Sequence, residues 1–287
     1  MPYRGAYRWL LLLFPAVVLA FWPGYLMRIG QVSWELHFHG ITAALWIALL
    51  ALQSWTIQRP GVASGRALHR LAGRFSLGLF PLFWAAGLAI IRFQAAGFVA
   101  RDGAFHTAFG ARLTPVDILT SAATLFLYYQ ALRNRRSMLT HAAALLAMPL
   151  FLLPPILGRL LQILPPFAIH DASEMGRFAV GLHLSNALAI LIGLALYAKR
   201  PSTAWPFLAA ALWLLLETLA FETLGRSKPW EALMAPIAAI HPFAVVATGL
   251  VTASFVAWLG WIHGRSRSGR DALAAETGGL ASGGAAA

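Results

Sequence analysis

The chain has 287 residues, of which 59% are hydrophobic and only 11% charged, against about 25% charged in an ordinary soluble domain. This composition excludes a soluble globular protein and predicts a polytopic, all-α membrane protein. The absence of cysteine excludes disulfides, thiolate metal sites and cysteine nucleophiles. The net charge of +12 is better explained by arginine in loops that flank a lipid bilayer than by binding to nucleic acid.

Eight apolar runs are long enough to form transmembrane helices, since about 20 residues cross about 30 Å of hydrocarbon. The predicted helices, in chain order, are residues 9–27, 35–57, 75–96, 115–132, 139–163, 178–198, 204–223 and 237–262. The first run follows arginines but precedes no small-residue cleavage site, so it is predicted to remain as a helix. The pair Pro154-Pro155 is predicted to kink or break the fifth run.

Arginine and lysine are distributed unequally between the two predicted sides of the membrane. With a cytoplasmic N-terminus, fourteen of the 22 basic residues fall on the inner side: Arg4, Arg8, Arg59, Arg66, Arg70, Arg74, Arg133, Arg135, Arg136, Lys199, Arg200, Arg265, Arg267 and Arg270. Because positive residues concentrate in cytoplasmic loops, this bias predicts a multi-pass protein of the bacterial inner membrane with both termini in the cytoplasm.

The runs also suggest an internal duplication. Thr114-Pro115-Val116-Asp117 opens the fourth run much as His241-Pro242-Phe243-Ala244 opens the eighth, and Leu36-His37 aligns with Leu182-His183. Four helices per unit is an even number, so both units would insert in the same orientation, as two parallel four-helix repeats. The predicted division is a first repeat at 1–137, a second at 138–265 and a disordered cytoplasmic tail at 266–287.

Polar residues gather near the outer ends of the even-numbered runs, all of which point from outside to inside. These residues are Glu35, His37, His39, Asp117, His183 and His241, and Glu217 approaches the same side from the seventh run. Neutral imidazole is a good ligand for iron, copper and zinc, so the histidines predict a haem or metal site near the outer face. Placing an ionisable side chain at membrane depth costs free energy, so such a residue is expected to have a functional role.

Two of these residues also have a structural interpretation as helix caps. Asp117 lies three residues after Thr114, with Pro115 at the first predicted helical position, which is close to a capping box. For Asp117 the capping interpretation is favoured. His241 immediately precedes a proline in the same way, and for it capping and a functional role are equally good interpretations.

The other histidines are not equivalent. His37 and His39 are about 200° apart around a regular helix, so only one of them can face a given ligand. His183 is the hardest to explain structurally, because it lies several residues inside its run with no charged residue before Lys199. A functional role is therefore favoured for His183.

Residues 36–74 resemble a stretch found in uncharacterised bacterial inner-membrane proteins. The resemblance rests on His39-Gly40, Trp46, Gln53 and Leu68-His69-Arg70, and it implies no activity.

The architecture as a whole resembles the haem A synthase family, in which histidines on helices six and eight hold a b-type haem. In this chain His183 and His241 match those positions, and His37 or His39 matches the histidine of helix two. The fourth run carries Thr114 and Asp117 in place of a histidine, so the resemblance implies at most a single haem, between helices six and eight.

We therefore expect an inner-membrane protein that binds a b-type haem, or alternatively copper or zinc, in an oxidoreductase or electron-transfer role. His183 and His241 would be the axial ligands, with Arg177 or Arg159 near the propionates. The candidates for a second site, which would serve metal, quinone or other substrate, or proton transfer, are Glu35, His37, His39, Asp117 and Glu217.

Two other functions fit the same residues. A transporter would use Arg159, Glu217 and Glu222 to line the path of a small substrate. An accessory membrane subunit would have no site of its own, and its eleven tryptophans would be interfacial anchors. The predicted partners are the lipid bilayer and, for the haem function, a quinone or a redox partner protein.

Overall fold

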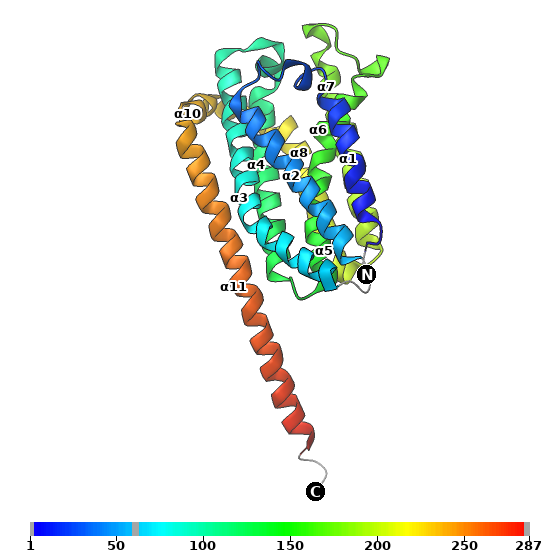
Figure 1. Cartoon of the computed structure of the whole chain (residues 1–287). Helices are drawn as coiled ribbons and strands as arrows, with labels where there is room; N and C mark the ends of the chain where they lie inside the picture. The colour runs from blue at the N-terminus through cyan, green and yellow to red at the C-terminus, as the bar shows by residue number, and fades with distance from the viewer. Residues whose placement is uncertain (1–2, 59–62, 284–287) are drawn as a thin grey trace.

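The computed structural model describes residues 3–58 and 63–283, with side chains described for 3–58 and 65–264, and it is helical throughout most of this length (Figure 1). No strand occurs among the described residues. The α-helices are α1 (Ala6–Phe21), α2 (Trp34–Ile57), α3 (Ala63–Ala100), α4 (Gly103–Arg133), α5 (Met138–Ala147), α6 (Leu153–Leu161), α7 (Gly176–Ala198), α8 (Pro201–Glu222), α9 (Lys228–Ala232), α10 (Met234–Ala239) and α11 (Pro242–Gly283). The 3-10 turns are η1 (Leu26–Arg28), η2 (Met148–Leu152), η3 (Pro165–Phe167), η4 (Ala172–Met175) and η5 (Leu224–Arg226).

Six stretches of the described chain are long and apolar enough to cross a membrane. They are Trp34–Ile57, Gly65–Ala100, Met138–Leu161, Ala172–Ala198, Pro201–Arg226 and Pro242–Gly264. The prediction of an all-α protein is confirmed, and these helices support a multi-pass membrane protein. The two remaining predicted runs are also helical, but α1 is shorter and α4 contains Arg112 and Asp117.

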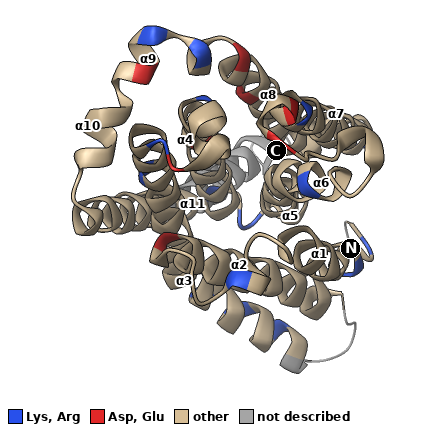
Figure 2. Cartoon of the chain, turned by 90° about the horizontal axis from the view of Figure 1, so that it is seen from above, with Lys and Arg blue, Asp and Glu red and all other residues tan. Residues whose placement is uncertain are grey.

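The helices form a ring (Figures 1 and 2). Around it, α1 packs on α2, α2 on α3, α3 on α4, α4 on α8, α8 on α7, α7 on α6, and α6 on α1. The fifth predicted segment, which comprises α5, η2 and α6, crosses the ring obliquely. Its first helix, α5, contacts α4 and α8, whereas α6 contacts α1 and α7. The chain starts at the lower end in Figure 1, which we call the inner end; α2 begins and α8 finishes at the opposite, outer end.

The last helix does not occupy the place that a repeat requires. In the first half α3 packs on α4, whereas α11 leaves α8 and packs on α3 and α4 outside the ring. The two halves therefore differ in the position of their fourth helix. The predicted superposition of Thr114 on His241 is wrong for this reason.

Proline shapes two of the membrane helices. The predicted break in the fifth segment is confirmed, since η2 separates α5 from α6 between Pro149 and Pro154. The predicted start of the fourth helix is wrong, because α4 begins at Gly103 and continues through Pro115. Pro115 cannot donate to the carbonyl of Ala111, and the indole Nε1 of Trp230 donates to that oxygen instead, at 3.0 Å.

An aromatic cluster forms the centre of the core. Trp46 on α2 is 2% exposed and packs against Phe80, Phe83 and Tyr128, with ring centroids 5.3, 6.0 and 5.7 Å away. The rings of Phe80 and Tyr128 are stacked at 3.8 Å, and the hydroxyl of Tyr128 lies 3.1 Å from that of Ser76. Aromatic contacts thus join α2, α3 and α4.

The C-terminal segment differs from the predicted disordered tail. The backbone of α11 stays helical to Gly283 (Figure 1). The segment contains one run of strong helix formers, Ala272-Leu273-Ala274-Ala275-Glu276, which favours a helix locally although Gly269, Gly278 and Gly279 do not. The last four residues of the predicted tail, 284–287, lie outside the described residues.

Candidate functional site

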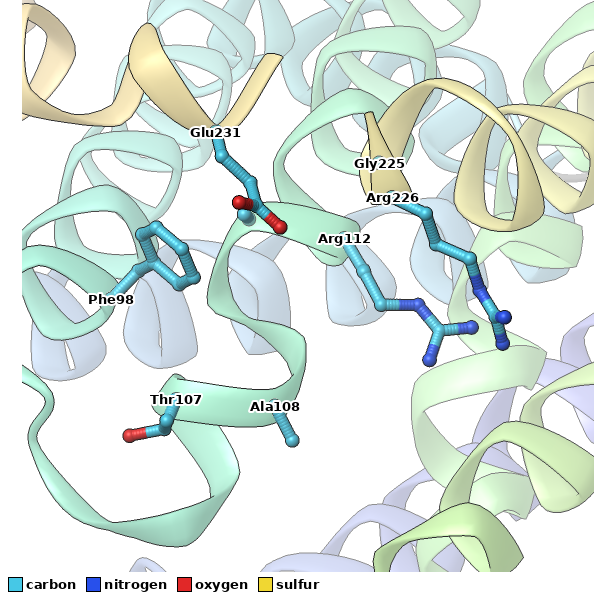
Figure 3. Close-up of a pocket in the computed structure, with 8 residues that line it drawn as sticks. Phe98, Thr107, Ala108, Arg112, Gly225, Arg226 and Glu231 are labelled. Atoms are coloured by element: carbon cyan, nitrogen blue, oxygen red, sulfur yellow. The ribbon is translucent and has the colours of Figure 1, made fainter. Parts of the chain in front are cut away.

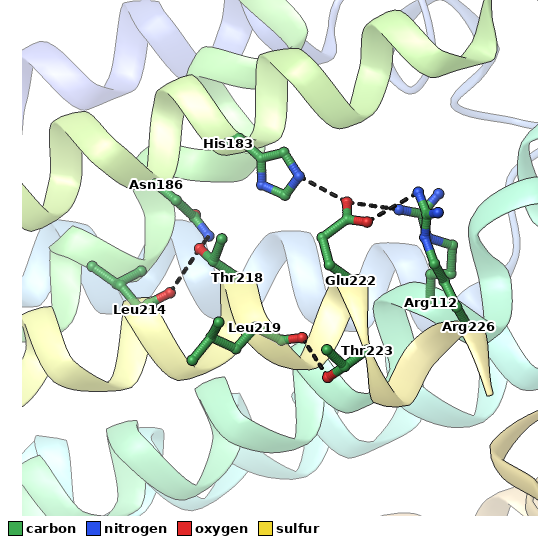
Figure 4. A network of polar contacts seen from close by, with 9 residues as sticks. All are labelled: Arg112, His183, Asn186, Leu214, Thr218, Leu219, Glu222, Thr223 and Arg226. Carbon is green, nitrogen blue, oxygen red and sulfur yellow. Dashed lines mark hydrogen bonds and ion pairs between the residues drawn. The ribbon is translucent and has the colours of Figure 1, made fainter.

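Glu222, the last residue of α8, joins three other segments at the outer end of the ring (Figure 4). Its Oε1 lies 2.8 Å from Nε2 of His183 on α7 and accepts a hydrogen bond from Nη2 of Arg112 on α4, also at 2.8 Å. Its Oε2 lies 3.0 Å from Nη2 of Arg226 on η5. The carboxylate of Glu222 is therefore shared by two guanidinium groups and an imidazole. The four side chains together carry a net charge of at least +1.

Close packing of η5 on α4 holds this network together. A Cβ on Gly225 would lie 2.7 Å from Cα of Arg112, so only glycine allows the turn to come this close. The guanidinium of Arg112 also lies over the ring of Phe221, with Cζ 4.0 Å from the ring centre. Together these contacts fix Arg112 between a carboxylate and an aromatic face.

A pocket of about 300 Å³ opens beside the network (Figure 3). It lies between the ends of α3 and α4 and the segment η5–α9, and its polar lining includes Thr107, Arg112, Arg226 and Glu231. Figure 3 shows the side chains of Arg112 and Arg226 extending in the same direction on one side of the pocket. Both arginines also bind Glu222, so the pocket and the Glu222 network share two side chains.

A second polar cluster lies deeper in the ring, where three helices converge. Glu217 on α8 is 2% exposed and accepts a hydrogen bond from the hydroxyl of Thr120 on α4, at 2.7 Å. Asp117, also on α4, is close enough to interact electrostatically with Glu217 and with Arg159 on α6. The Oδ2 atom of Asp117 is buried and has no hydrogen-bond partner among the described residues.

Arg159 is the cation of this interior cluster. Its Nη1 donates to the carbonyl of Pro155 at 2.8 Å, and its Cζ lies 4.5 Å from the ring centre of Phe21 on α1. No ion pair within 4 Å joins Arg159 to a carboxylate in the described part of the chain. The helices that carry Asp117 and Arg159, α4 and α6, are not neighbours around the ring.

The two clusters lie at different depths in the ring. Arg112 and Asp117 are five residues apart on α4, and Glu217 and Glu222 are five apart on the antiparallel α8. Five residues of helix rise about 7.5 Å and turn about 140°, so the pair Arg112–Glu222 lies nearer the outer end than Asp117 and Glu217 and on a different face of each helix. Ionisable groups therefore extend from the outer end into the apolar part of the ring.

The structure does not bring His183 and His241 together. His183 is bonded to Glu222, whereas His241 is exposed at the start of α11, where its Nδ1 accepts from the backbone N–H of Phe243. In Figures 1 and 2 α10, which leads into α11, lies across the outer end from α7. This placement contradicts the predicted pairing of the two as axial ligands. Among the described residues no group of three or more His, Cys, Asp or Glu could hold a metal ion.

The other candidates of the second run have partners within the protein. Glu35 is 5% exposed and lies 3.5 Å from Nη1 of Arg92 on α3, which also donates through Nε to the carbonyl of Ile240. Nδ1 of His37 lies 2.8 Å from the hydroxyl of Tyr25. His39 stacks on Phe83, and its buried Nδ1 has no partner.

Arg177 lies in the first turn of α7 and binds residues of the preceding outer loop. It forms an ion pair with Glu174 at 2.7 Å and donates to the carbonyl of Ala168. In the same loop hydrogen bonds from the hydroxyl and backbone N–H of Ser173 lower the pKa of Asp171. Arg177 and Arg159 therefore lie in different environments, and only Arg159 lies next to the interior carboxylates.

Sequence reasoning did not identify Arg112, Arg226 and Thr120 as site residues. The equal spacing of five residues on α4 and on α8 could have indicated that Arg112 lies at the depth of Glu222 and Asp117 at the depth of Glu217. That inference requires knowing that α4 begins before Thr114. Comparison of the chain with protein-family models, characterised proteins and solved structures finds no match.

Proposed function

We propose that this protein is a membrane transporter that couples the movement of a small polar solute to protons. Asp117, Arg159 and Glu217 would form its proton- and solute-binding site. The observation that carries the proposal is the convergence of these three ionisable side chains, from three helices, inside a ring of apolar helices. Intramembrane ionisable groups are costly to maintain and mark ion, proton or substrate pathways.

A charge count explains why a proton would bind. One guanidinium and two carboxylates carry a net charge of −1 when all are ionised, and no ion pair within 4 Å joins either Asp117 or Glu217 to a cation among the residues described. Two neighbouring carboxylates in an apolar environment do not both ionise readily, so one proton or one bound cation is required for balance. The same proton could be exchanged for a cationic group of a solute.

The outer network supports an access route to this site. The Arg112–Glu222 pair, whose arginine lines the outer pocket, lies nearer the outer end than the interior carboxylates, and its groups can rearrange only by breaking hydrogen bonds to Glu222. Glu222 would therefore act as an outer gate.

The proposal predicts a protonated carboxyl group that depends on Asp117 and Glu217. Infrared difference spectra of the purified protein between high and low pH should contain the carbonyl stretch of a buried carboxylic acid. We expect this band to be lost or shifted in both Asp117→Asn and Glu217→Gln, and to be unchanged in Glu231→Gln, whose carboxylate pairs with Lys228 at the outer surface.

Proteoliposomes that contain a pH-sensitive dye supply the functional half of this test. A panel of small polar solutes is added outside, and at least one should drive proton movement in the wild type but not in Asp117→Asn or Glu217→Gln. A protein without the carboxylic acid band, or with a band that neither substitution affects, would contradict the proposed site.

The orientation proposed is eight crossings in a bacterial inner membrane, with both termini in the cytoplasm. Its support is the bias of arginine and lysine to the end where the chain starts. Reporter fusions after Arg101 and after Arg135 should report opposite sides, with Arg101 outside. If both fusions report the same side, α4 does not cross the membrane and the count of eight is wrong.

The haem-dependent oxidoreductase function stays a prediction. His183 supports the haem function, because its buried Nδ1 has no hydrogen-bond partner among the described residues. An absorption spectrum of the purified protein distinguishes the two functions, because a Soret band that disappears in His183→Ala belongs to haem and not to a proton-coupled carboxylate site.

A further inference from the structure

The first three turns of α3 have three distinct faces. Arg66, Arg70 and Arg74 are spaced by four residues and therefore lie within about 80° of one another around the helix. All three are exposed, and none forms an ion pair within the described part of the chain. We call these residues the arginine stripe.

A second exposed face lies beside the arginine stripe and is apolar. Leu68, Leu71 and Phe75 are 37%, 63% and 59% exposed, and they lie about 60–120° further around the helix from Arg74. The remaining face, which includes the buried Ala72, packs against the ring, where α3 contacts α2. Figure 1 shows this part of α3 at the inner end of the molecule, below α2.

Among the side chains that the structure describes, no acidic group pairs with the arginine stripe. Eight of the ten acidic residues lie at the outer end or inside the ring: Glu35, Asp102, Asp117, Asp171, Glu174, Glu217, Glu222 and Glu231. The other two, Asp271 and Glu276, belong to the part of α11 whose side chains are not described. Further exposed cations share the inner end, namely Arg4, Arg8, Arg136, Lys199 and Arg200. The described part of the inner end therefore carries an excess of positive charge, which favours an anionic binding partner.

We infer that the arginine stripe binds the phosphate headgroups of anionic phospholipids in the inner leaflet. Guanidinium groups bind phosphate oxygens through paired hydrogen bonds. The neighbouring apolar face points to a lipid and not to free phosphate, because Leu68, Leu71 and Phe75 would lie in the acyl region while the arginines reach the headgroups. A helix with a basic face beside an apolar face is typical of the membrane interface.

The test measures binding of phosphatidylglycerol and phosphatidylcholine to the full-length protein in detergent, by native mass spectrometry and by the lipid-dependent rise in melting temperature. Each arginine near an anionic surface contributes about fivefold in affinity. Replacement of all three arginines by glutamine is therefore expected to weaken binding of phosphatidylglycerol about 100-fold. Binding of phosphatidylcholine should stay weak in both proteins.

Three controls make the result decisive. The pair Arg28→Gln and Arg101→Gln removes exposed arginines of the outer end and should leave phosphatidylglycerol binding unchanged. Replacement of the stripe by lysine keeps its charge and should retain most of the binding, which separates loss of charge from misfolding. Inorganic phosphate should not reproduce the stabilisation. Equal lipid binding by the glutamine variant and the wild type, equal binding of the two lipids, or full stabilisation by phosphate alone would overturn the inference.

Discussion

Arg159→Met is expected to abolish solute-driven proton movement and to destabilise the protein by about 1.5–3 kcal/mol, the usual cost of losing a hydrogen bond made by a charged group. Methionine has similar length and no charge, so the substitution leaves Asp117 and Glu217 without a nearby cation. The guanidinium also packs over Phe21 and bonds to the carbonyl of Pro155, and both contacts are lost. Stability is measured by thermal and denaturant unfolding in detergent, and proton movement in dye-loaded proteoliposomes.

A rescue experiment separates the charge of Arg159 from its packing. If the two carboxylates are neutralised as well, by Asp117→Asn and Glu217→Gln, the part of the lost stability that arises from unbalanced charge should return, although transport stays absent. Arg28→Met, at an exposed position on η1, serves as the matched control and should change neither quantity. An Arg159→Met protein with wild-type stability and proton movement would show that the interior cluster is not functional.

Trp46→Ala is expected to cost about 3–5 kcal/mol of stability, as large aromatic-to-alanine changes in a core do. Trp46 connects α2 to Phe80 and Phe83 on α3 and to Tyr128 on α4, so its loss opens a cavity where three helices meet. Its indole N–H has no hydrogen-bond partner among the described residues, so the loss arises from packing and not from a broken hydrogen bond. Unfolding in detergent measures the effect.

Trp258→Ala is the matched control for this core substitution. Trp258 lies on α11 and is 55% exposed, so the same change of side chain creates no internal cavity. Its cost should be below about 1 kcal/mol, as for substitutions away from a core. Equal effects of the two tryptophan substitutions would mean that the aromatic cluster does not hold α2, α3 and α4 together.

The amino-acid sequence by itself determined the class of the protein and the approximate place of its long helices. Each of the eight predicted runs contains a helix, although the runs 9–27 and 237–262 are helical only in part, and the proline break before Leu153 occurs as expected. Hydropathy and proline chemistry act over a single helix, so they can be read without knowledge of the neighbours. The three groups of the interior cluster were also singled out as candidates, because any ionisable residue in an apolar run is conspicuous.

The partners of these residues were decided only by the tertiary structure. Pro115 was interpreted as a helix start, but Trp230, which is distant in sequence, bonds the carbonyl that Pro115 leaves free, and α4 continues. His183 was paired with His241 from the resemblance to the haem A synthase family, yet α11 packs outside the ring and His183 bonds to Glu222. Which side chains meet across a helix ring depends on the rotation and packing of every helix at once. Those quantities are set by side-chain fit between elements distant in sequence, and no local pattern contains them.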